Sequence, residues 1–207
     1  MNQDQIKQLN EAVEAVKTRK IENVYFVACG GSKAIFDPAQ FIFDRETTLP
    51  SFVYNANEFI HRCPKGLGEN SLVVTCSHSG NTLETTRATQ LAGDKGALTI
   101  SFSYRVDSPL WKATQHPISY VWGPESNPGD NNNGMLYRLV FSILNVLQPN
   151  EKYERAIKAC DNLGKVYAAN KAKFAESAKA FGKKYKNNKL IYTLSLIHIS
   201  EPTRPIS

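Results

Sequence analysis

Five short runs of β-branched, aromatic and other apolar residues constrain the fold more than any other feature of the sequence. They lie at 23–29, 51–55, 71–76, 97–103 and 117–122. Several of them are apolar almost throughout instead of alternating, which is typical of strands covered on both faces. Helix-like segments separate several of the runs, at 33–47, 55–62 and 81–93. This order predicts an α/β fold, a doubly wound and mainly parallel five-stranded sheet flanked by helices.

Further helical segments flank the predicted sheet. Residues 1–20 are polar with helical spacing, and the turn DNNNG at 130–134 offers N-caps for a helix that should end before Pro149. From Tyr153 to Tyr185, apolar residues recur at spacings of three, four or seven. This stripe predicts a long helix or helix pair, and we interpret residues 151–187 as a helical hairpin or linker.

The net charge of +6 does not by itself indicate nucleic-acid binding. Residues 1–150 hold 13 Lys and Arg against 14 Asp and Glu, whereas residues 151–189 hold 11 against 4. Lysines spaced around one helix are more often its solvated face than a nucleic-acid-binding surface. No apolar run approaches the roughly 18 residues of a membrane-spanning helix, and residues 1–20 lack the apolar centre of a signal peptide. We expect a soluble, cytoplasmic protein that binds neither nucleic acid nor membrane.

The four cysteines lack the spacing of metal ligands. Cys29 and Cys76 end strand-like runs, where a buried free thiol is the simplest interpretation. The other two are Cys63 and Cys160. We therefore expect no disulfide, no metal and no other cofactor.

Two loops carry the residues that point to a function. They are ACGGSKA at 28–34 and CSHSGNT at 76–82, and each follows a predicted strand and enters a predicted helix. In an open parallel sheet, ligands bind beyond the carboxyl ends of the strands, where the strand order reverses. Backbone N–H groups and the positive end of a helix point at this place, so it suits an anion.

The residue types in both loops favour a phosphate ester. Gly30 and Gly31 let the backbone approach closely, and hydroxyl donors come from Ser32, Ser77, Ser79 and Thr82. Neutral donors hold a phosphate less tightly than arginines would, which allows a substrate to leave.

The spacing of residues in these two loops fits neither a Walker loop nor G-x-G-x-x-G, which disfavours nucleotide hydrolysis and NAD binding. Taken alone, SHSGNT is equally compatible with a polar strand-to-helix turn.

The pair CGGS and SHSGNT resembles the loops of the SIS (sugar isomerase) domain. In addition, FVACGGSKAI, FDRE, YNANEFIHR, CSHSGNTLET, KGALTI and VWG occur in the order seen in fructosamine-6-phosphate deglycases, which contain two SIS domains. The resemblance covers about residues 20–194. It implies an SIS domain over 1–150, and it implies a phosphate-binding site formed by Gly30, Gly31, Ser32, Ser77, His78, Ser79, Gly80, Asn81 and Thr82.

The same resemblance implies a reaction. A 6-phosphorylated Amadori compound such as fructoselysine 6-phosphate is split into glucose 6-phosphate and a free amine, through a proton shift between C1 and C2 and hydration of the imine. A carboxylate and a histidine suit these transfers. The resemblance places that pair in the second SIS domain, so we assign no catalytic residue here. Glu125 is a candidate pocket residue, although a solvent-facing loop carboxylate fits it equally well.

Alternatives remain open. One is that the whole protein is an aldose–ketose isomerase or an aminotransferase acting on fructose 6-phosphate. The other is that this chain is a non-catalytic sugar-phosphate-binding module. SIS proteins usually pair, so the resemblance also implies a homo-oligomer.

Residues 188–207 resemble the start of a second SIS domain followed by an aberrant tail. NNKLIYTLS at 187–195 has the composition of an opening strand, but LIHISEPTRPIS contains two prolines and offers no helix to cover a sheet. This tail resembles the translation of sequencing-adapter DNA. We therefore expect that the native reading frame is lost near Ser195 and that the second domain is truncated.

Overall fold

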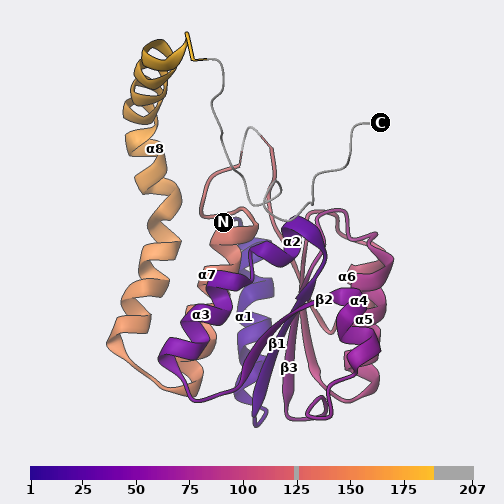
Figure 1. The fold of residues 1–207 in the computed structure, drawn as a ribbon. Coiled ribbons are helices and arrows are strands. Elements are labelled where there is room, and N and C mark those ends of the chain that lie inside the picture. The colour runs from indigo at the N-terminus through magenta and orange to yellow at the C-terminus, as the bar shows by residue number, and fades with distance from the viewer. Residues whose placement is uncertain (124–125, 189–207) are drawn as a thin grey trace, which may run out of the picture.

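The computed structural model describes residues 1–123 and 126–188. Within them, all strands belong to one parallel sheet of order β2-β1-β3-β4-β5. The strands are β1 (Asn23–Ala28), β2 (Ser51–Asn55), β3 (Ser71–Cys76), β4 (Leu98–Ser103) and β5 (His116–Ser119). Helices lie on both faces (Figure 1), so the doubly wound α/β fold is confirmed.

The central strands are buried on both faces, as their continuous apolar sequences predict. In β1, Val24 and Phe26 pack into one hydrophobic core, whereas Tyr25 and Val27 pack into a second core on the opposite face. All residues of β3 and β4 are buried. Alternate side chains thus anchor the sheet to both helical layers.

The helices divide into two layers (Figure 1). One layer holds α1 (Gln3–Lys17), α3 (Asp37–Glu46) and α7 (Asn132–Leu147), and the other holds α4 (Ala56–Arg62), α5 (Leu83–Asp94) and α6 (Pro109–Ala113). The short α2 (Gly30–Ala34) follows β1 directly. The Asn131 side chain accepts a hydrogen bond from the Gly134 amide and so caps α7, which ends before Pro149 as expected.

Two predicted elements differ from the structure. The single helix expected over 33–47 is split into α2 and α3, because Pro38 lacks an N–H group and occupies the first turn of a new helix. The last strand was expected over 117–122, but β5 ends at Ser119. Beyond it, the Val121 amide donates to the Asp130 carbonyl at 2.8 Å, so the chain pairs with a loop rather than with β4.

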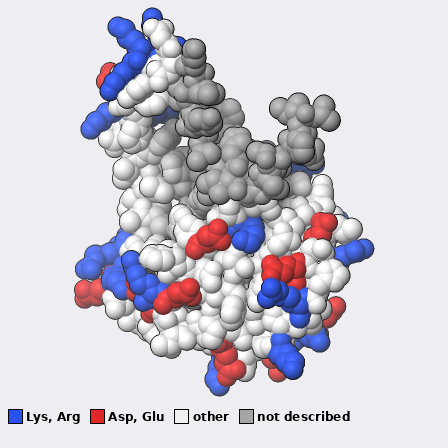
Figure 2. Space-filling view, viewed as in Figure 1, with Lys and Arg blue, Asp and Glu red and all other residues white. Residues whose placement is uncertain are grey.

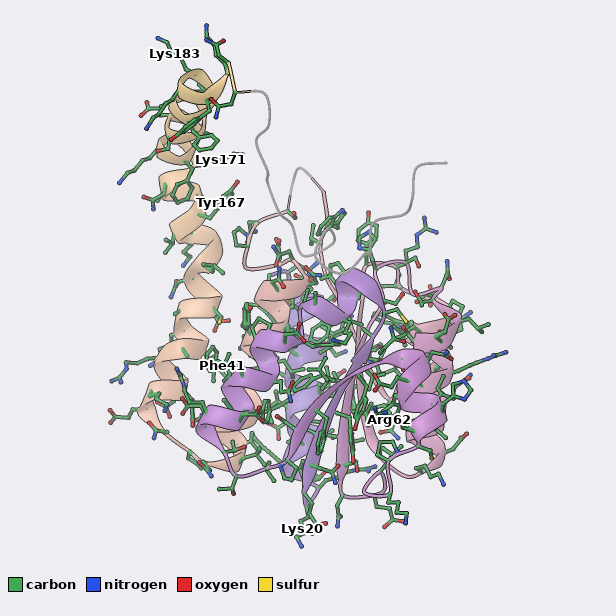
Figure 3. The ribbon with its side chains drawn as sticks, in the orientation of Figure 1. Lys20, Phe41, Arg62, Tyr167, Lys171 and Lys183 are labelled. Carbon is green, nitrogen blue, oxygen red and sulfur yellow. The ribbon has the colours of Figure 1, made fainter. Side chains whose placement is uncertain are left out.

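The segment after α7 forms one continuous helix, α8 (Glu151–Tyr185). The predicted long helix is therefore confirmed, and the alternative of a helical hairpin is wrong. The first half of α8 packs on α7, where Arg138 Nε lies 2.8 Å from the Asp161 carboxylate. Its outer half extends beyond the body of the domain, as the labelled Tyr167, Lys171 and Lys183 illustrate (Figure 3). Lysines gather at this end (Figure 2), whereas both charge signs are mixed over the body.

Part of the sequence lies outside the described residues. The expected strand at 187–195 falls almost entirely there, and so does the tail at 196–207. None of the helices in the described ranges is long and apolar enough to cross a bilayer.

Core burial makes a first prediction. Phe43 is fully buried and its ring contacts Phe26 edge-on at 5.7 Å, whereas Phe174 on α8 is 52% exposed. Phe43→Ala should lower the free energy of unfolding by about 3–5 kcal/mol, because it opens a cavity between β1 and α3. The matched Phe174→Ala should change it by less than about 0.5 kcal/mol. Urea denaturation followed by circular dichroism measures both, and equal losses would contradict this placement of the core.

Candidate functional site

The two predicted loops lie side by side because β1 and β3 are neighbouring strands. Ala28 pairs with Cys76 in register, so the loops that follow β1 and β3 leave the sheet side by side at its carboxyl edge. The strand order reverses between β1 and β3, and ligands of open α/β sheets bind at such a point. The structure therefore brings residues 30–32 next to residues 77–82. That these residues contact a phosphate stays a prediction.

The loop after β3 is held in shape by its own hydroxyl groups. Ser77 is only 2% exposed, and its Oγ accepts a hydrogen bond from the Gly80 amide at 3.2 Å. The same Oγ lies 2.9 Å from the Thr82 hydroxyl. Ser79 Oγ accepts from the Asn81 amide at 3.2 Å. In this conformation Ser77 positions the loop, whereas Ser79 and Thr82 keep part of their surface open to solvent.

Gly80 is the position of this loop that most strictly requires glycine. Its φ angle is +68°, and a Cβ built there would lie 2.0 Å from Ser108 Oγ. Its carbonyl accepts a hydrogen bond from the Leu110 amide at 3.0 Å. Because Ser108 caps α6 through the Trp111 amide, the loop is fixed against that short helix.

The first loop supplies a second set of neutral donors. Gly30 has a φ of +53°, and Ser32 is half-buried with its side chain near the Cys76 thiol. Lys33, the cation nearest in sequence, lies 3.7 Å from the Asp37 carboxylate. The N-terminus of α5 follows Thr82 and adds its positive helix end. Chemically, such an arrangement can bind an oxyanion through hydroxyl and amide groups.

His78 lies among aromatic side chains that the sequence analysis did not connect with it. Its ring stacks on Tyr104 at 5.3 Å and 6°, and it meets Trp122 edge-on at 5.1 Å. Its Nδ1 lies 2.9 Å from the Tyr120 hydroxyl. The sequence positions of these aromatic residues could have indicated the contact. Tyr104 follows β4 and Trp122 lies shortly after β5, so both lie at the same edge of the sheet as His78.

The environment of His78 favours the neutral ring. Partial burial, and to a lesser degree the positive charge of Arg105, hold the pKa of His78 below its ordinary value. Burial raises the pKa of the Tyr120 hydroxyl, so this group stays protonated and can donate to Nδ1.

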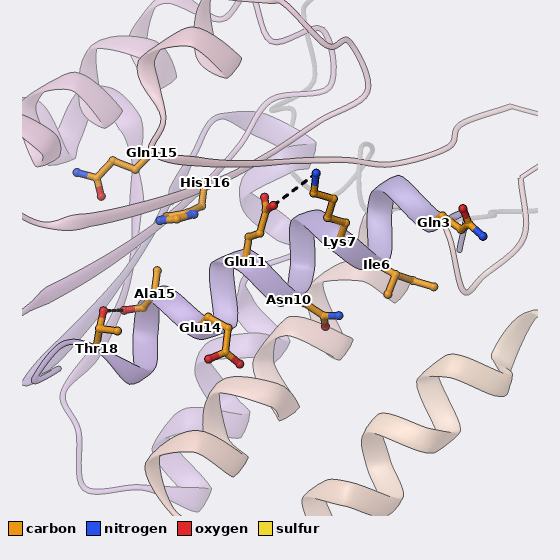
Figure 4. A pocket seen from close by; sticks show the side chains of 10 residues that line it. All are labelled: Gln3, Ile6, Lys7, Asn10, Glu11, Glu14, Ala15, Thr18, Gln115 and His116. Carbon is orange, nitrogen blue, oxygen red and sulfur yellow. Dashed lines mark hydrogen bonds and ion pairs between the residues drawn. The ribbon is translucent and has the colours of Figure 1, made fainter.

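The last candidate, Glu125, falls outside the described residues. Two other histidines were not candidates, and of these His61 is exposed on α4. His116 begins β5 and lines a groove of about 850 Å³ beside α1 (Figure 4), where Lys7 pairs with Glu11 at 3.9 Å. Because His116 lies at the amino end of its strand, it belongs to the edge of the sheet opposite the two loops.

The two cysteines at this edge differ in burial. Cys76 is buried as expected, and burial raises the pKa of its thiol to about 12. Cys29 is only half-buried, and the Thr85 hydroxyl donates to its sulfur at 3.9 Å. Within the described ranges, no three His, Cys, Asp or Glu side chains cluster as metal ligands would.

Comparison with known proteins identifies relatives of this chain. The SIS domain family matches residues 17–147. The fructosamine deglycase FrlB of Bacillus subtilis is 44% identical over 190 residues, which cover 91% of this chain and 58% of that protein. A fructoselysine 6-phosphate deglycase of Escherichia coli is 26% identical over 198 residues, covering 94% and 55% respectively. The chain thus spans little more than half the length of these relatives.

Solved structures agree in fold. A structure from Bacillus subtilis, described as that of a proposed phosphosugar isomerase, superposes with a TM-score of 0.79 at 44% identity, covering 90% of this chain and 57% of the other. One from Salmonella typhimurium gives a TM-score of 0.80 at 31% identity, covering 93% and 58%.

The close approach at Gly80 makes a second prediction. Gly80→Ala should lower the free energy of unfolding by at least about 2 kcal/mol, because the new methyl group meets Ser108 and φ is positive. Gly93→Ala is the matched control, since Gly93 lies in α5 with open space around its Cα. It should be neutral or stabilising by up to about 1 kcal/mol. Thermal or urea denaturation distinguishes the two, and a neutral Gly80→Ala would refute the fixed loop.

The neutral state of His78 makes a third prediction. Because the folded-state pKa is depressed, the unfolded chain binds this proton at a higher pH than the folded chain does. The contribution of His78 to stability is therefore complete above the ordinary histidine pKa and falls as the pH drops below it. An NMR titration of the ring should give a midpoint under the ordinary value, and His78→Gln should flatten the stability profile in that window. A midpoint above it would contradict the described environment.

Proposed function

Because the chain belongs to the SIS domain family, we propose that it binds the phosphate of a 6-phosphorylated fructosamine on behalf of a deglycase. In this reaction the sugar amine is split into glucose 6-phosphate and a free amine. The proposal is supported by the relatives named for fructosamine and fructoselysine 6-phosphate deglycase activity. We further propose that residues 1–150 form the SIS domain and that the protein assembles as a homo-oligomer.

The observation that carries the proposal is the adjacency, at the switch point of the sheet, of a loop with three hydroxyl groups and a glycine-containing loop with one. The phosphate would accept hydrogen bonds from Ser32, Ser79 and Thr82 and would face the N-terminus of α5. Ser77 and Gly80 hold the loop in the conformation that aims these groups. Since the donors are neutral, the site holds the phosphate firmly enough for selection and still releases the product.

The chemical steps need groups that move protons at C1 and C2 of the sugar. A carboxylate and a histidine suit that task, and the resemblance assigns the pair to a second SIS domain. His78 is engaged with the Tyr120 hydroxyl and is therefore poorly placed as the base. We therefore assign substrate binding to the residues described here and the proton transfers to the second SIS domain.

A second candidate is the isomerisation of a ketose phosphate. It is favoured by the solved relatives described as phosphosugar isomerases. Both candidates share the phosphate site and differ in whether an amine is released.

Binding tests the phosphate site. Ser79→Ala should weaken binding of fructoselysine 6-phosphate by about 1–3 kcal/mol in isothermal titration calorimetry, because a hydroxyl donor to the phosphate is lost. Ser177→Ala, an exposed position on α8, should leave the affinity unchanged. Fructoselysine without its phosphate should bind far more weakly to the unmodified chain. Equal affinity for both compounds would refute phosphate recognition.

Product analysis separates the two candidate reactions. The chain is incubated together with the remaining part of the B. subtilis relative, and glucose 6-phosphate release from fructoselysine 6-phosphate is followed enzymatically. Release of glucose 6-phosphate supports the deglycase. Isomerisation of fructose 6-phosphate without that release would favour the second candidate.

A further inference from the structure

Three aromatic rings gather on the loops that follow β3, β4 and β5. Tyr104 and Trp122 both contact the His78 ring, with centroid distances of 5.3 and 5.1 Å. Beneath them lies Tyr120, which is only 3% exposed and whose ring centroid is 5.9 Å from that of His78 and 6.4 Å from that of Tyr104. We call His78, Tyr104, Tyr120 and Trp122 the aromatic cluster.

The cluster is rigidly built and yet open to solvent. The buried Tyr120 fixes the His78 ring through its hydroxyl, and the Tyr104 amide donates to the His78 carbonyl at 3.1 Å. Even so, Tyr104 is 44% exposed and Trp122 is 49% exposed. Exposed rings that are held in place by a buried partner can bind a ligand, because each presents a large and rigid face.

The cluster adjoins the proposed phosphate site. His78 stands between Ser77 and Ser79 in the sequence, so its ring leaves the same loop that would hold the phosphate. A six-carbon sugar anchored by its phosphate must therefore extend its other end from this loop. The aromatic cluster lies along one of the directions in which the non-phosphorylated end of the sugar can extend.

We propose that the aromatic cluster binds the amine-bearing end of the substrate, with its cationic nitrogen against Tyr104 and Trp122 and an amino-acid carboxylate near Arg105. This proposal rests on the proposed function. It adds the residues that receive the amine-bearing end of that substrate.

The chemistry of the ligand matches the cluster. The nitrogen on C1 of a fructosamine is a secondary amine that is protonated near neutral pH, and a cation over an aromatic face is attracted by the ring quadrupole. Fructose 6-phosphate carries a neutral hydroxyl at that position. Since the pKa of His78 is depressed, the histidine does not add a competing positive charge.

Arg105 directly follows Tyr104 in the chain and is exposed, so its side chain can reach a ligand that lies beside Tyr104. Its positive charge would attract the carboxylate of an amino acid. The two features together favour an amino-acid adduct over the adduct of a simple alkylamine.

Calorimetry with paired ligands tests the proposal on the full chain. Tyr104→Leu and Trp122→Leu keep apolar bulk but remove the ring face, so each should weaken fructoselysine 6-phosphate binding by about 3- to 30-fold. Fructose 6-phosphate binding should change by less than about twofold. Tyr104→Phe keeps the face and should retain most of the affinity. Phe41→Leu, at a 62% exposed ring on α3, is the control for loss of a surface aromatic.

Arg105→Gln tests the carboxylate contact. It should weaken fructoselysine 6-phosphate binding while leaving the 6-phosphorylated adduct of butylamine unaffected. Equal effects on these two adducts would overturn the assignment of Arg105.

The outcomes separate this inference from the proposed function. If the unmodified chain binds fructose 6-phosphate and fructoselysine 6-phosphate equally well, the phosphate site stands and the amine site is wrong. Parallel losses for both ligands in the Leu variants would also overturn it, since they would indicate a structural role of the rings. If neither ligand binds, the proposed function fails and takes this inference with it.

Discussion

The in-register parallel pairing of β1 with β3 is the constraint on which the rest of the structure depends. It places Ala28 opposite Cys76, so the two loops begin at one level of the sheet. Both strands can lie in the centre of the sheet because their side chains are apolar on both of its faces and because helices cover each face. The burial that stabilises the domain therefore also fixes the relative position of the candidate binding groups.

Within the site, the polar side chains divide between two tasks. Ser77 is buried and bonded inside its loop, and Gly80 lets that loop approach Ser108 closely. Ser32, Ser79 and Thr82 retain surface that a ligand can reach. A binding site with few charges depends on the accurate placement of neutral hydrogen-bond donors. The contacts of Gly80 with Ser108 and Leu110 of α6 provide this placement.

Local patterns in the sequence were enough to predict much of this arrangement. The strands were recognisable from continuous apolar runs, and the start of α7 from its asparagine cap. The split between α2 and α3 was missed, although Pro38 at a first helical turn was a local clue. The short β5 and the partnership of His78 with Tyr120 depend on contacts between residues far apart in the chain. Propensity and periodicity do not encode such contacts, so the aromatic cluster became visible only in three dimensions.

The outer half of α8 differs from every other helix in how it is stabilised. Residues 171–180 are all exposed, so their backbone hydrogen bonds receive almost no support from tertiary packing. An isolated helical segment of this kind is marginally stable in water. Its outer turns consequently open and close as a separate unit. Their amide protons exchange with solvent long before those of the sheet, so hydrogen exchange divides the backbone amides into a fast group and a slow group.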